Sequence, residues 1–247
     1  MRKVLIAGIS GAIGSGIALE LLERDPSVRV IGLCRSPGKV PEAIAQSPRV
    51  SLLDWDAARP GAAENVAASL VGMLAAAEGL DDVVFAAGIL HGAGMFPEKR
   101  VEDLEGDALV QAFQVNAASF ALLIRALMPW LKHRRFKRVV AISAKVGSIS
   151  DNRFGGWYAY RSSKAALNML VKTLSVELPR RCKPVACVAV HPGTTRSALS
   201  EPFAASLAQL EVHSAGQTAT NILAVMDALD ESGNGCFYNW DGAELPW

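Results

Sequence analysis

Short hydrophobic runs alternate with longer segments of helical periodicity along this chain. Apolar residues, many of them β-branched, make up six runs, at residues 4–7, 28–33, 50–53, 83–86, 139–142 and 185–190. Apolar positions repeat instead at helical spacing in residues 62–77, 109–131 and 158–178. The runs are hydrophobic throughout, as parallel strands are when helices cover both faces of their sheet. The pattern therefore predicts an α/β fold, a doubly wound parallel β-sheet of the Rossmann type with helices on both faces.

The chain is predicted to form a single domain. Its 247 residues suit one α/β domain, and the sequence contains no linker, repeat or low-complexity segment. Residues 197–212 show weak periodicity and lie between the last predicted strand and a further helix. We interpret them as a candidate lid over a substrate pocket.

Composition and charge narrow the class of protein. Hydrophobic residues make up 51% of the chain, charged residues 20%, and the formal net charge is +1. This is the profile of a globular enzyme. Basic residues do gather between residues 132 and 138, where a solvated helix end before a strand explains them better than a phosphate-binding surface. We therefore expect no nucleic-acid partner.

The cysteines and the amino terminus bear on location. Four cysteines occur, Cys34, Cys182, Cys187 and Cys236. They form no C-x-x-C pair and lack the spaced histidines of a zinc site, so we expect reduced thiols, no metal site and a cytoplasmic location.

Arg2 and Lys3 before an apolar run imitate a secretory signal, but four glycines interrupt that run between residues 8 and 16. No uninterrupted apolar stretch is long enough to span a bilayer, so no membrane association is expected.

A glycine-rich turn follows the first predicted strand and opens a helix. Gly8, Gly11 and Gly14 would let the backbone approach a pyrophosphate, whose negative charge the amino end of the helix stabilises. A glycine cluster alone also fits a mere tight turn, but its place between strand and helix favours a dinucleotide site.

Arg35 indicates which dinucleotide would bind. It follows the second strand about 20 residues beyond the turn, where an NAD enzyme usually places an acid for the ribose hydroxyl. A guanidinium can pair with the additional 2′-phosphate of NADP, so we expect NADP(H) to be preferred over NAD(H). A solvated surface arginine is the alternative. Asp54 ends the third strand and could accept a hydrogen bond from the adenine amino group or cap the next segment.

Tyr160 and Lys164 are the candidate chemical pair. They are four residues apart, which places them on one face of a helix. A phenol with a pKa of about 10 is a poor acid–base catalyst near neutrality, and a neighbouring cation should lower that pKa. The lysine could also hydrogen-bond the nicotinamide ribose. The small residues at 86–89, after the fourth strand, would let a cofactor lie against the backbone.

Several motifs taken in order resemble the short-chain dehydrogenase/reductase family along nearly the whole chain. They are the glycine turn, residues 86–89, Asn116, the strand end at Ser143, the pair of Tyr160 and Lys164, and residues 191–193. Within that family, residues 147–149, 155–168 and 240–247 are similar to the C-factor and sniffer-like carbonyl reductase branch. The resemblance implies an NADP(H)-dependent oxidoreductase that transfers hydride between nicotinamide and a small-molecule carbonyl or alcohol substrate.

The same resemblance implies roles for particular residues. Tyr160 is the general acid in reduction, Lys164 orients the ribose and tunes the tyrosine, and Asn116 holds a water that links Lys164 to solvent. Together with the residues derived above, the expected cofactor contacts are Gly8, Ser10, Gly11, Ile13, Gly14, Arg35, Asp54, Trp55, Ala87, Gly88, Ile89, Ser143, Tyr160, Lys164, Pro192, Gly193, Thr195 and Ser197.

The most serious departure from the family pattern concerns a serine. Ala144 stands where the family has a serine that hydrogen-bonds the substrate oxygen. Ser143 precedes it and should face the other way along a strand, toward the cofactor. Ser148 is the candidate that replaces the missing serine in catalysis, and Ser143 or no serine at all are the alternatives. Losing one such donor costs about 10²- to 10³-fold in rate in other enzymes.

Two further departures affect the cofactor side. Ala12 replaces the middle glycine of the family's turn, which tightens the approach of a phosphate. Phe85 and Ala86 replace two asparagines that support the strand and turn in the family. Their absence threatens stability more than chemistry.

These departures leave alternative functions open. A carbonyl reductase or alcohol dehydrogenase is one, and a cofactor-binding sensor or signalling protein with weak or no catalysis is another. C-factor is named for a role in intercellular signalling, which supports the second. An epimerase or dehydratase would need an additional acid or base, for which His91 and His213 are the loop candidates. The helices at 108–131 and 157–178 commonly pair across a two-fold axis in the family, which implies a homo-oligomer, a dimer or a tetramer.

Overall fold

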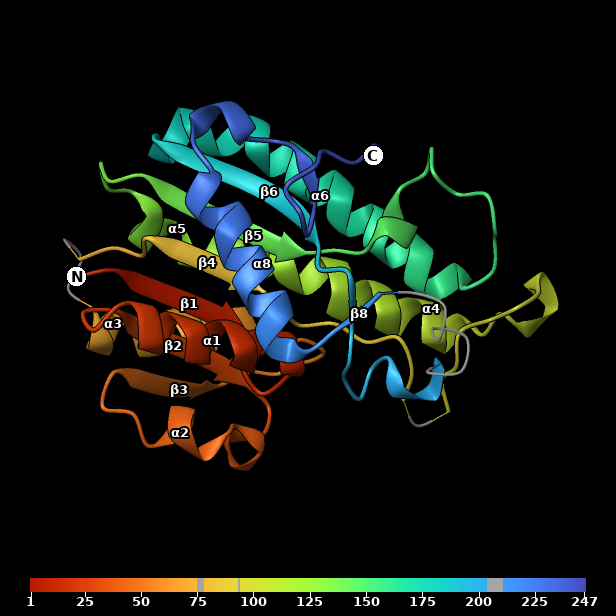
Figure 1. The fold of residues 1–247 in the computed structure, drawn as a ribbon, viewed down its shortest axis with the longest axis horizontal. Helices are drawn as coiled ribbons and strands as arrows, with labels where there is room; N and C mark the ends of the chain where they lie inside the picture. Colours follow the sequence, from red (N-terminus) through yellow and green to blue (C-terminus); the bar gives the residue numbers. More distant parts are fainter. Residues whose placement is uncertain (75–77, 93, 204–210) are drawn as a thin grey trace.

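Seven parallel strands form one sheet in the computed structural model, in the order β3–β2–β1–β4–β5–β6–β9 (Figure 1). The structure describes residues 1–74, 78–92, 94–203 and 211–247. The predicted doubly wound parallel sheet is confirmed, and the six hydrophobic runs match six of its strands to within two residues at each end. The seventh strand, at the edge, was not predicted. The strands are β1 (Lys3–Ala7), β2 (Arg29–Cys34), β3 (Val50–Asp54), β4 (Asp82–Phe85), β5 (Lys137–Ile142), β6 (Val185–His191) and β9 (Phe237–Asn239).

Helices cover both faces of the sheet, and the alternation of side chains along each strand divides the core between them. Leu5 and Ala7 of β1 point to one face, where α3 (Ala62–Met73), α5 (Ser119–Leu131) and α6 (Tyr158–Cys182) pack. Val4 and Ile6 point to the other, where α1 (Ala12–Arg24), α2 (Glu42–Ala45) and α8 (Ala215–Ala228) pack. Figure 1 views the molecule from the side of α1 and α8.

Residues 106–131 form one continuous helical segment, which begins three residues before the predicted start. It consists of α4 (Gly106–Phe113), the π-helical turn η3 (Gln114–Ala118) and α5. By length and composition alone this segment could cross a membrane, so the expectation that no stretch is long enough needs correction. Phe120, Leu123 and Leu127 are buried in the core against the sheet. Packing on the sheet therefore accounts for its apolar composition.

Helix α6 ends later than the sequence predicts. The apolar periodicity ends at residue 178, and the proline that follows disfavours a helix, because it removes a backbone donor and clashes with the preceding turn. The helix continues through Pro179 to Cys182, and Leu178 and Cys182 are both buried in the core. Burial of these two side chains outweighs the local preference of the proline. The predicted helix at 62–77 ends at Met73, and its residues 75–77 lie outside the described part of the chain.

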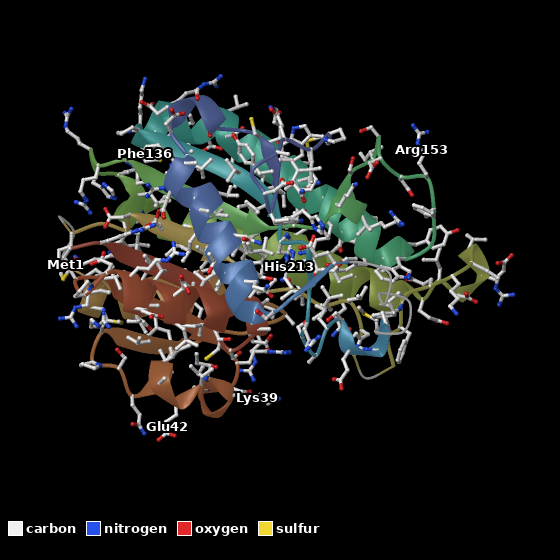
Figure 2. All side chains as sticks on the ribbon, in the orientation of Figure 1. Met1, Lys39, Glu42, Phe136, Arg153 and His213 are labelled. Atoms are coloured by element: carbon white, nitrogen blue, oxygen red, sulfur yellow. The ribbon has the colours of Figure 1, made fainter. Side chains whose placement is uncertain are left out.

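Short elements complete the fold at the ends of the sheet. Strands β7 (Thr194–Thr195) and β8 (Val212–His213) pair in parallel. Of the candidate lid at 197–212, residues 204–210 lie outside the described residues. Figure 2 shows Arg153 on a loop that projects from the sheet before α6, and His213 just before α8. The 3₁₀ turns are η1 (Pro37–Lys39), η2 (Val101–Asp103), η4 (Lys145–Gly147), η5 (Glu201–Phe203) and η6 (Glu231–Gly233).

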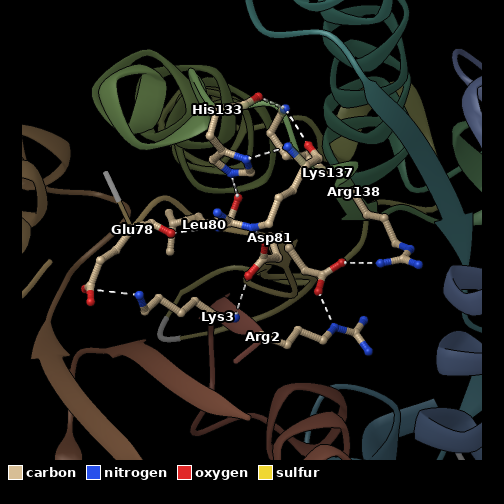
Figure 3. Close-up of polar contacts among 10 residues, drawn as sticks. Arg2, Lys3, Glu78, Leu80, Asp81, His133, Lys137 and Arg138 are labelled. Carbon is tan, nitrogen blue, oxygen red and sulfur yellow. Dashed lines mark hydrogen bonds and ion pairs between the residues drawn. The ribbon is translucent and has the colours of Figure 1, made fainter. Parts of the chain in front are cut away.

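A buried carboxylate anchors the amino ends of the central strands. Asp82, the first residue of β4, is fully buried and accepts hydrogen bonds from the guanidinium groups of Arg2 and Arg138 (Figure 3). The Arg138 Nη1 to Asp82 Oδ1 distance is 3.1 Å. Removing one partner of such a buried ion pair strongly destabilises the folded protein, because the remaining partners keep uncompensated charge.

The neighbouring strand starts are joined in the same way. Asp81 accepts from the backbone N–H of Lys3 at 2.9 Å and from Nε of Arg135 at 2.6 Å. Lys137 is fully buried, and its Nζ donates to the backbone oxygens of His133 and Arg135 at 2.7 and 2.8 Å. The basic run at 132–138 is therefore more than the solvated helix end that the sequence suggested. Arg138 of β5 pairs with Asp82 of β4, and Arg135 pairs with Asp81, which also accepts from Lys3 of β1.

We expect Asp82→Asn to lower the free energy of unfolding by about 3 kcal/mol, because it leaves two guanidinium groups without their buried counter-charge. Urea denaturation followed by circular dichroism measures the change. Glu177→Gln is the control, since Glu177 pairs with Arg181 on an exposed helix surface and its loss should change stability by less than about 0.5 kcal/mol. Equal losses in both variants would contradict the anchoring role of Asp82.

Candidate active site

The parallel sheet gathers the candidate residues at one edge. All strands point the same way, so the turns that follow them meet at the carboxyl end of the sheet. The register places Ala7 beside Leu33 and Phe85, and Phe85 beside Ala141. The glycine turn, Arg35, residues 86–89 and Ser143 each follow one of these strands and therefore lie along a common edge.

The turn between β1 and α1 requires glycine at two positions. Gly8 has a φ of +88°, and a Cβ there would lie 2.8 Å from the backbone nitrogen of Ala87. A Cβ at Gly14 would lie 2.3 Å from the carbonyl oxygen of Gly8. The amino end of α1 has no side-chain cap and no acidic residue in its first turn, so its free N–H groups and positive dipole end suit an anion. Ala12 is the first residue of this helix.

A cavity lies beside this turn. Of the predicted cofactor contacts, Gly8, Ser10, Gly11, Arg35, Trp55, Ala87, Gly88 and Ile89 line it. Ala86, in the segment 86–89 expected to lie against a cofactor, also lines it. Other lining residues, which the sequence did not reveal, include Leu33, Cys34, Asp56, Ala57 and Val115.

The predicted contacts Arg35, Asp54 and Ile13 differ in where their side chains lie. Arg35 is exposed, and in the described part of the chain it makes no hydrogen bond or ion pair, so its guanidinium is free to meet a phosphate at the cavity. Asp54 is also exposed but does not line the cavity, whereas Trp55 and Asp56 do. Ile13 packs against the core cluster between the sheet, α1 and α8. A glycine cradle, an uncapped helix end and a free cation together fit a phosphate-bearing dinucleotide.

Lys164 and Tyr160 lie on the first turns of α6. Lys164 is buried, its Nζ donates to the carbonyl oxygen of Ile142 at 2.9 Å, and it stands 5.8 Å from the centre of the Tyr160 ring. A Cβ on Gly88 would be 3.5 Å from Lys164 Nζ and 3.3 Å from Asn116 Oδ1. The turn after β4 thus approaches both side chains closely, and the three predicted polar residues share one site.

The side chain of Asn116 is the hub of this site. Its Oδ1 accepts from the backbone N–H of Ile89 at 2.7 Å, and its Nδ2 donates to the carbonyl of Ile89 and to Ser163 Oγ, both at 2.9 Å. Both amide donors are therefore used inside the protein, and only Oδ1 can accept a further hydrogen bond. The π-helical turn η3 holds this fully buried residue.

Burial sets the protonation states of the pair. It raises the pKa of Tyr160 to about 12, because the phenolate loses hydration, and it lowers the pKa of Lys164 to about 8, because the ammonium does. The sequence-based expectation was that the cation would lower the tyrosine pKa. At 5.8 Å from the ring, and itself desolvated, Lys164 does not overcome the effect of burial on the phenol.

The two serines near the site differ in how their hydroxyls are used. Ser143 is buried and its Oγ donates to Asn168 Oδ1 at 2.6 Å. Ser148 is buried, accepts from the backbone N–H of Asp151 at 3.2 Å, and lies 3.5 Å from Ser150 Oγ. Ala144, between them, offers no donor.

Two histidines lie near the end of β6, His191 as its last residue and His213 in β8. Nδ1 of His191 and Nδ1 of His213 are buried and have no hydrogen-bond partner among the described residues. Burial lowers the pKa of His191 to about 4, so this ring is neutral near pH 7. A Cβ on Gly193 would lie 3.0 Å from His213 Nδ1. The unpartnered Nδ1 of His213 beside the predicted contact Gly193 fits a polar ligand at this segment.

The other predicted contacts of this segment are placed as follows. Pro192 is buried, and Thr195 in β7 is buried with its Oγ1 2.9 Å from Thr218 Oγ1. Ser197 lies 3.4 Å from Ser200 through their hydroxyls and starts the described part of the candidate lid. His91, the second loop histidine, contacts the carbonyl oxygen of Ala198 at 3.1 Å through Nε2. Among the described residues, no group of three His, Cys, Asp or Glu side chains could hold a metal ion.

Aromatic packing supports the end of β4, where the family resemblance suggested a loss of support because Phe85 and Ala86 replace two asparagines. Phe85 is fully buried and meets Trp55 at 6.2 Å and Phe120 at 5.3 Å, both edge to face. Such pairs contribute about 0.5 to 1.5 kcal/mol beyond their buried area. The end of β4 is thus supported by apolar contacts.

Comparison with known proteins agrees with this geometry. A family model described as short chain dehydrogenase matches residues 2–207. The C-signal protein of Myxococcus xanthus is 32% identical over 145 residues, which cover 59% of this chain and 82% of that protein. The carbonyl reductase Sniffer of D. melanogaster superposes with a TM-score of 0.86 at 27% identity, over 100% of both chains. The NADPH-bound carbonyl reductase from chicken fatty liver gives a TM-score of 0.87 at 25% identity, over 100% of this chain and 94% of that chain.

Replacing Asn116 by alanine tests its place at the hub. The variant leaves the backbone N–H and carbonyl of Ile89 without their partner, so we expect the Ile89 amide hydrogen to exchange about tenfold faster, the equivalent of one net hydrogen bond. Hydrogen exchange followed by NMR measures this rate. The amide of Ala86, which donates to Ala7 within the sheet, is the internal control. Equal acceleration at both amides would indicate general destabilisation and contradict a local role.

Proposed function

The chain belongs to the short chain dehydrogenase family, and from this premise we propose that it is a carbonyl reductase that prefers NADP(H) over NAD(H). Members act with NAD(P) on CH–OH or C=O groups of small molecules, so the reaction class follows from the family. The observation that carries the proposal is the joint placement of Tyr160, Lys164 and Asn116 beside the dinucleotide cavity. The preference for NADP(H) rests on the free guanidinium of Arg35.

When bound, the cofactor supplies the hydride. The protein supplies the proton, from the hydroxyl of Tyr160 to the substrate oxygen. A pKa of about 12 keeps this phenol protonated near neutral pH, which suits reduction of a carbonyl. The Lys164 ammonium, fixed by the Ile142 carbonyl, stabilises the phenolate that remains after the transfer.

Reprotonation of Tyr160 would proceed through Lys164 and a water on Asn116. Oδ1 of Asn116 is the one group of that amide able to accept a further hydrogen bond, and it faces the same space beside Gly88 as Lys164 Nζ. A water donating to Oδ1 would therefore stand next to the ammonium. This supports the proton relay that the family resemblance implies.

A second candidate function is a cofactor-binding sensor with weak or no catalysis. The observation that favours it is the absence of a hydroxyl at Ala144, the position of the family's substrate-binding serine, while the hydroxyl of neighbouring Ser143 donates to Asn168. Ser148 Oγ accepts from the backbone N–H of Asp151 and keeps its own hydrogen for another partner, so it stays the candidate replacement. The C-signal relative, by its name, is also a signalling protein. Turnover that requires Tyr160 would decide for the reductase.

We further propose that the protein works in the cytoplasm as a homo-oligomer, a dimer or a tetramer. All four cysteines are free, which suits a reducing compartment. The helices expected to pair present exposed apolar side chains, at Val110, Phe113, Leu122, Met169 and Val176. Burial of these side chains between copies would stabilise an assembly.

Tyr160→Phe removes the proton donor and keeps the ring. We expect kcat for carbonyl reduction to fall at least about 10²-fold, with NADPH binding within a factor of two. The measurements are NADPH oxidation against a panel of aldehydes, ketones, α-dicarbonyls and quinones, and NADPH titration by fluorescence. Tyr158→Phe, two residues earlier and exposed, is the matched control and should stay fully active. Undiminished turnover in Tyr160→Phe would exclude the proposed mechanism.

Arg35→Ala removes the cation expected to meet the 2′-phosphate. We expect kcat/KM for NADPH to fall about 10- to 100-fold and that for NADH to change little, because a hydrogen bond to a charged group contributes about 1.5 to 3 kcal/mol. Lys39→Ala, which removes an exposed cation from η1 in the same loop, is the control and should leave both values unchanged. A preference for NADPH that survives in Arg35→Ala would show that another group recognises the phosphate.

A further inference from the structure

A series of aromatic rings leads away from the catalytic tyrosine. Trp157 meets Tyr160 at 6.3 Å between ring centres, and Phe203 meets Trp157 at 5.1 Å. His91 continues the series at 6.0 Å from Phe203, and Phe96 at 6.0 Å from His91. The rings come from three separate segments, the loop after β4, the turn before α6, and η5 in the described part of the candidate lid.

The backbone holds Trp157 in an unfavourable conformation. Its φ is +52° and its ψ +44°, and it is the only residue other than glycine with a positive φ in the described ranges. A bulky side chain is strained there, and glycine, which occupies the two preceding positions, would relieve the strain. Strain of this kind persists where the surrounding structure imposes it, and it concentrates at functional sites.

Glu98 imposes this conformation through two contacts. Its carbonyl oxygen accepts from the backbone N–H of Trp157 at 2.6 Å. Its buried carboxylate accepts from the N–H of Ala159 at 3.3 Å, in the first turn of α6. The chain therefore enters the catalytic helix along a fixed path, and the indole is held one turn before Tyr160.

The rings that follow Tyr160 in this series remain partly accessible. Trp157, Phe203 and His91 are half-buried. Among the described residues, no lysine or arginine lies over Trp157, Phe203 or Phe96, whereas Lys164 lies over Tyr160. Aromatic pairs prefer ring centres 4.5 to 7 Å apart, so a flat ring attached to a carbonyl held at Tyr160 would find suitable partners here.

We propose that Trp157 and Phe203 form the substrate-binding wall and select uncharged carbonyl compounds that carry an aromatic ring next to the C=O group. The proposal rests on the proposed reductase function and adds the substrate class to it. Tyr160 acts on the carbonyl oxygen, and the adjacent ring packs against the indole and the phenyl group.

Two ketones of equal carbon number test the wall. Acetophenone carries a flat phenyl ring and cyclohexyl methyl ketone a saturated one. The quantity measured is the ratio of kcat/KM for the two, in wild type, Trp157→Leu and Phe203→Leu. Comparison between variants cancels the intrinsic difference in ketone reactivity. We expect the ratio to fall about three- to tenfold in each variant, with kcat/KM for the cyclohexyl ketone and NADPH binding nearly unchanged.

Phe154→Leu is the matched control, since Phe154 lies in the same turn, is 94% exposed and touches no ring among the described residues. Trp157→Phe should restore most of the ratio. An unchanged ratio in Trp157→Leu and Phe203→Leu, or an equal loss with both ketones, overturns the proposal and leaves the reductase function standing. If wild type turns over neither ketone nor any compound of the broader carbonyl panel, the reductase function fails, and the wall with it.

Discussion

A single buried amide holds the catalytic edge together. Asn116 exchanges two hydrogen bonds with the backbone of Ile89 and a third with Ser163, so one side chain joins the turn after β4, the helix from α4 to α5, and α6. Alanine or leucine could not satisfy the same backbone groups, which would then be buried without partners. Gly88, in the turn that Asn116 holds, lies against Lys164 as well, so the bridge brings this turn, the amide and the lysine together. The cofactor cavity and the proton donor keep their relative places through it.

Much of this arrangement was readable in the sequence because it depends on local patterns. Uninterrupted hydrophobic runs identified six strands, and the glycines at 8 and 14 identified a turn that no larger side chain fits. The strand β9 escaped because it has only three residues and pairs at the edge of the sheet. The end of α6 was placed too early because periodicity stops at residue 178, whereas burial of Leu178 and Cys182 carries the helix through Pro179.

The rest of the site depends on contacts between distant segments, which periodicity does not report. Asp54 ends its strand as expected, yet the two residues that follow it line the cavity. The tyrosine pKa moves upward because burial, which a motif does not reveal, outweighs the nearby cation. Trp157 could have been noticed only through its two preceding glycines, and its partner Phe203 is 46 positions further along the chain. The family resemblance implied the roles of Tyr160 and Lys164, whereas the contacts around them became visible only in the structure.

The ion pairs of Asp81 and Asp82 lie at the opposite end of the strands from Tyr160. These ion pairs therefore stabilise the amino ends of the strands, away from the catalytic residues. The sequences of the loops at the carboxyl ends can change without affecting them. Free-energy changes at well-separated sites add nearly independently. A lineage, or a laboratory selection, can therefore exchange loops around the catalytic edge to acquire new substrates without eroding the anchor that keeps the sheet folded. The residues needed for folding and the loops that can acquire new substrate specificity thus lie at opposite ends of the strands.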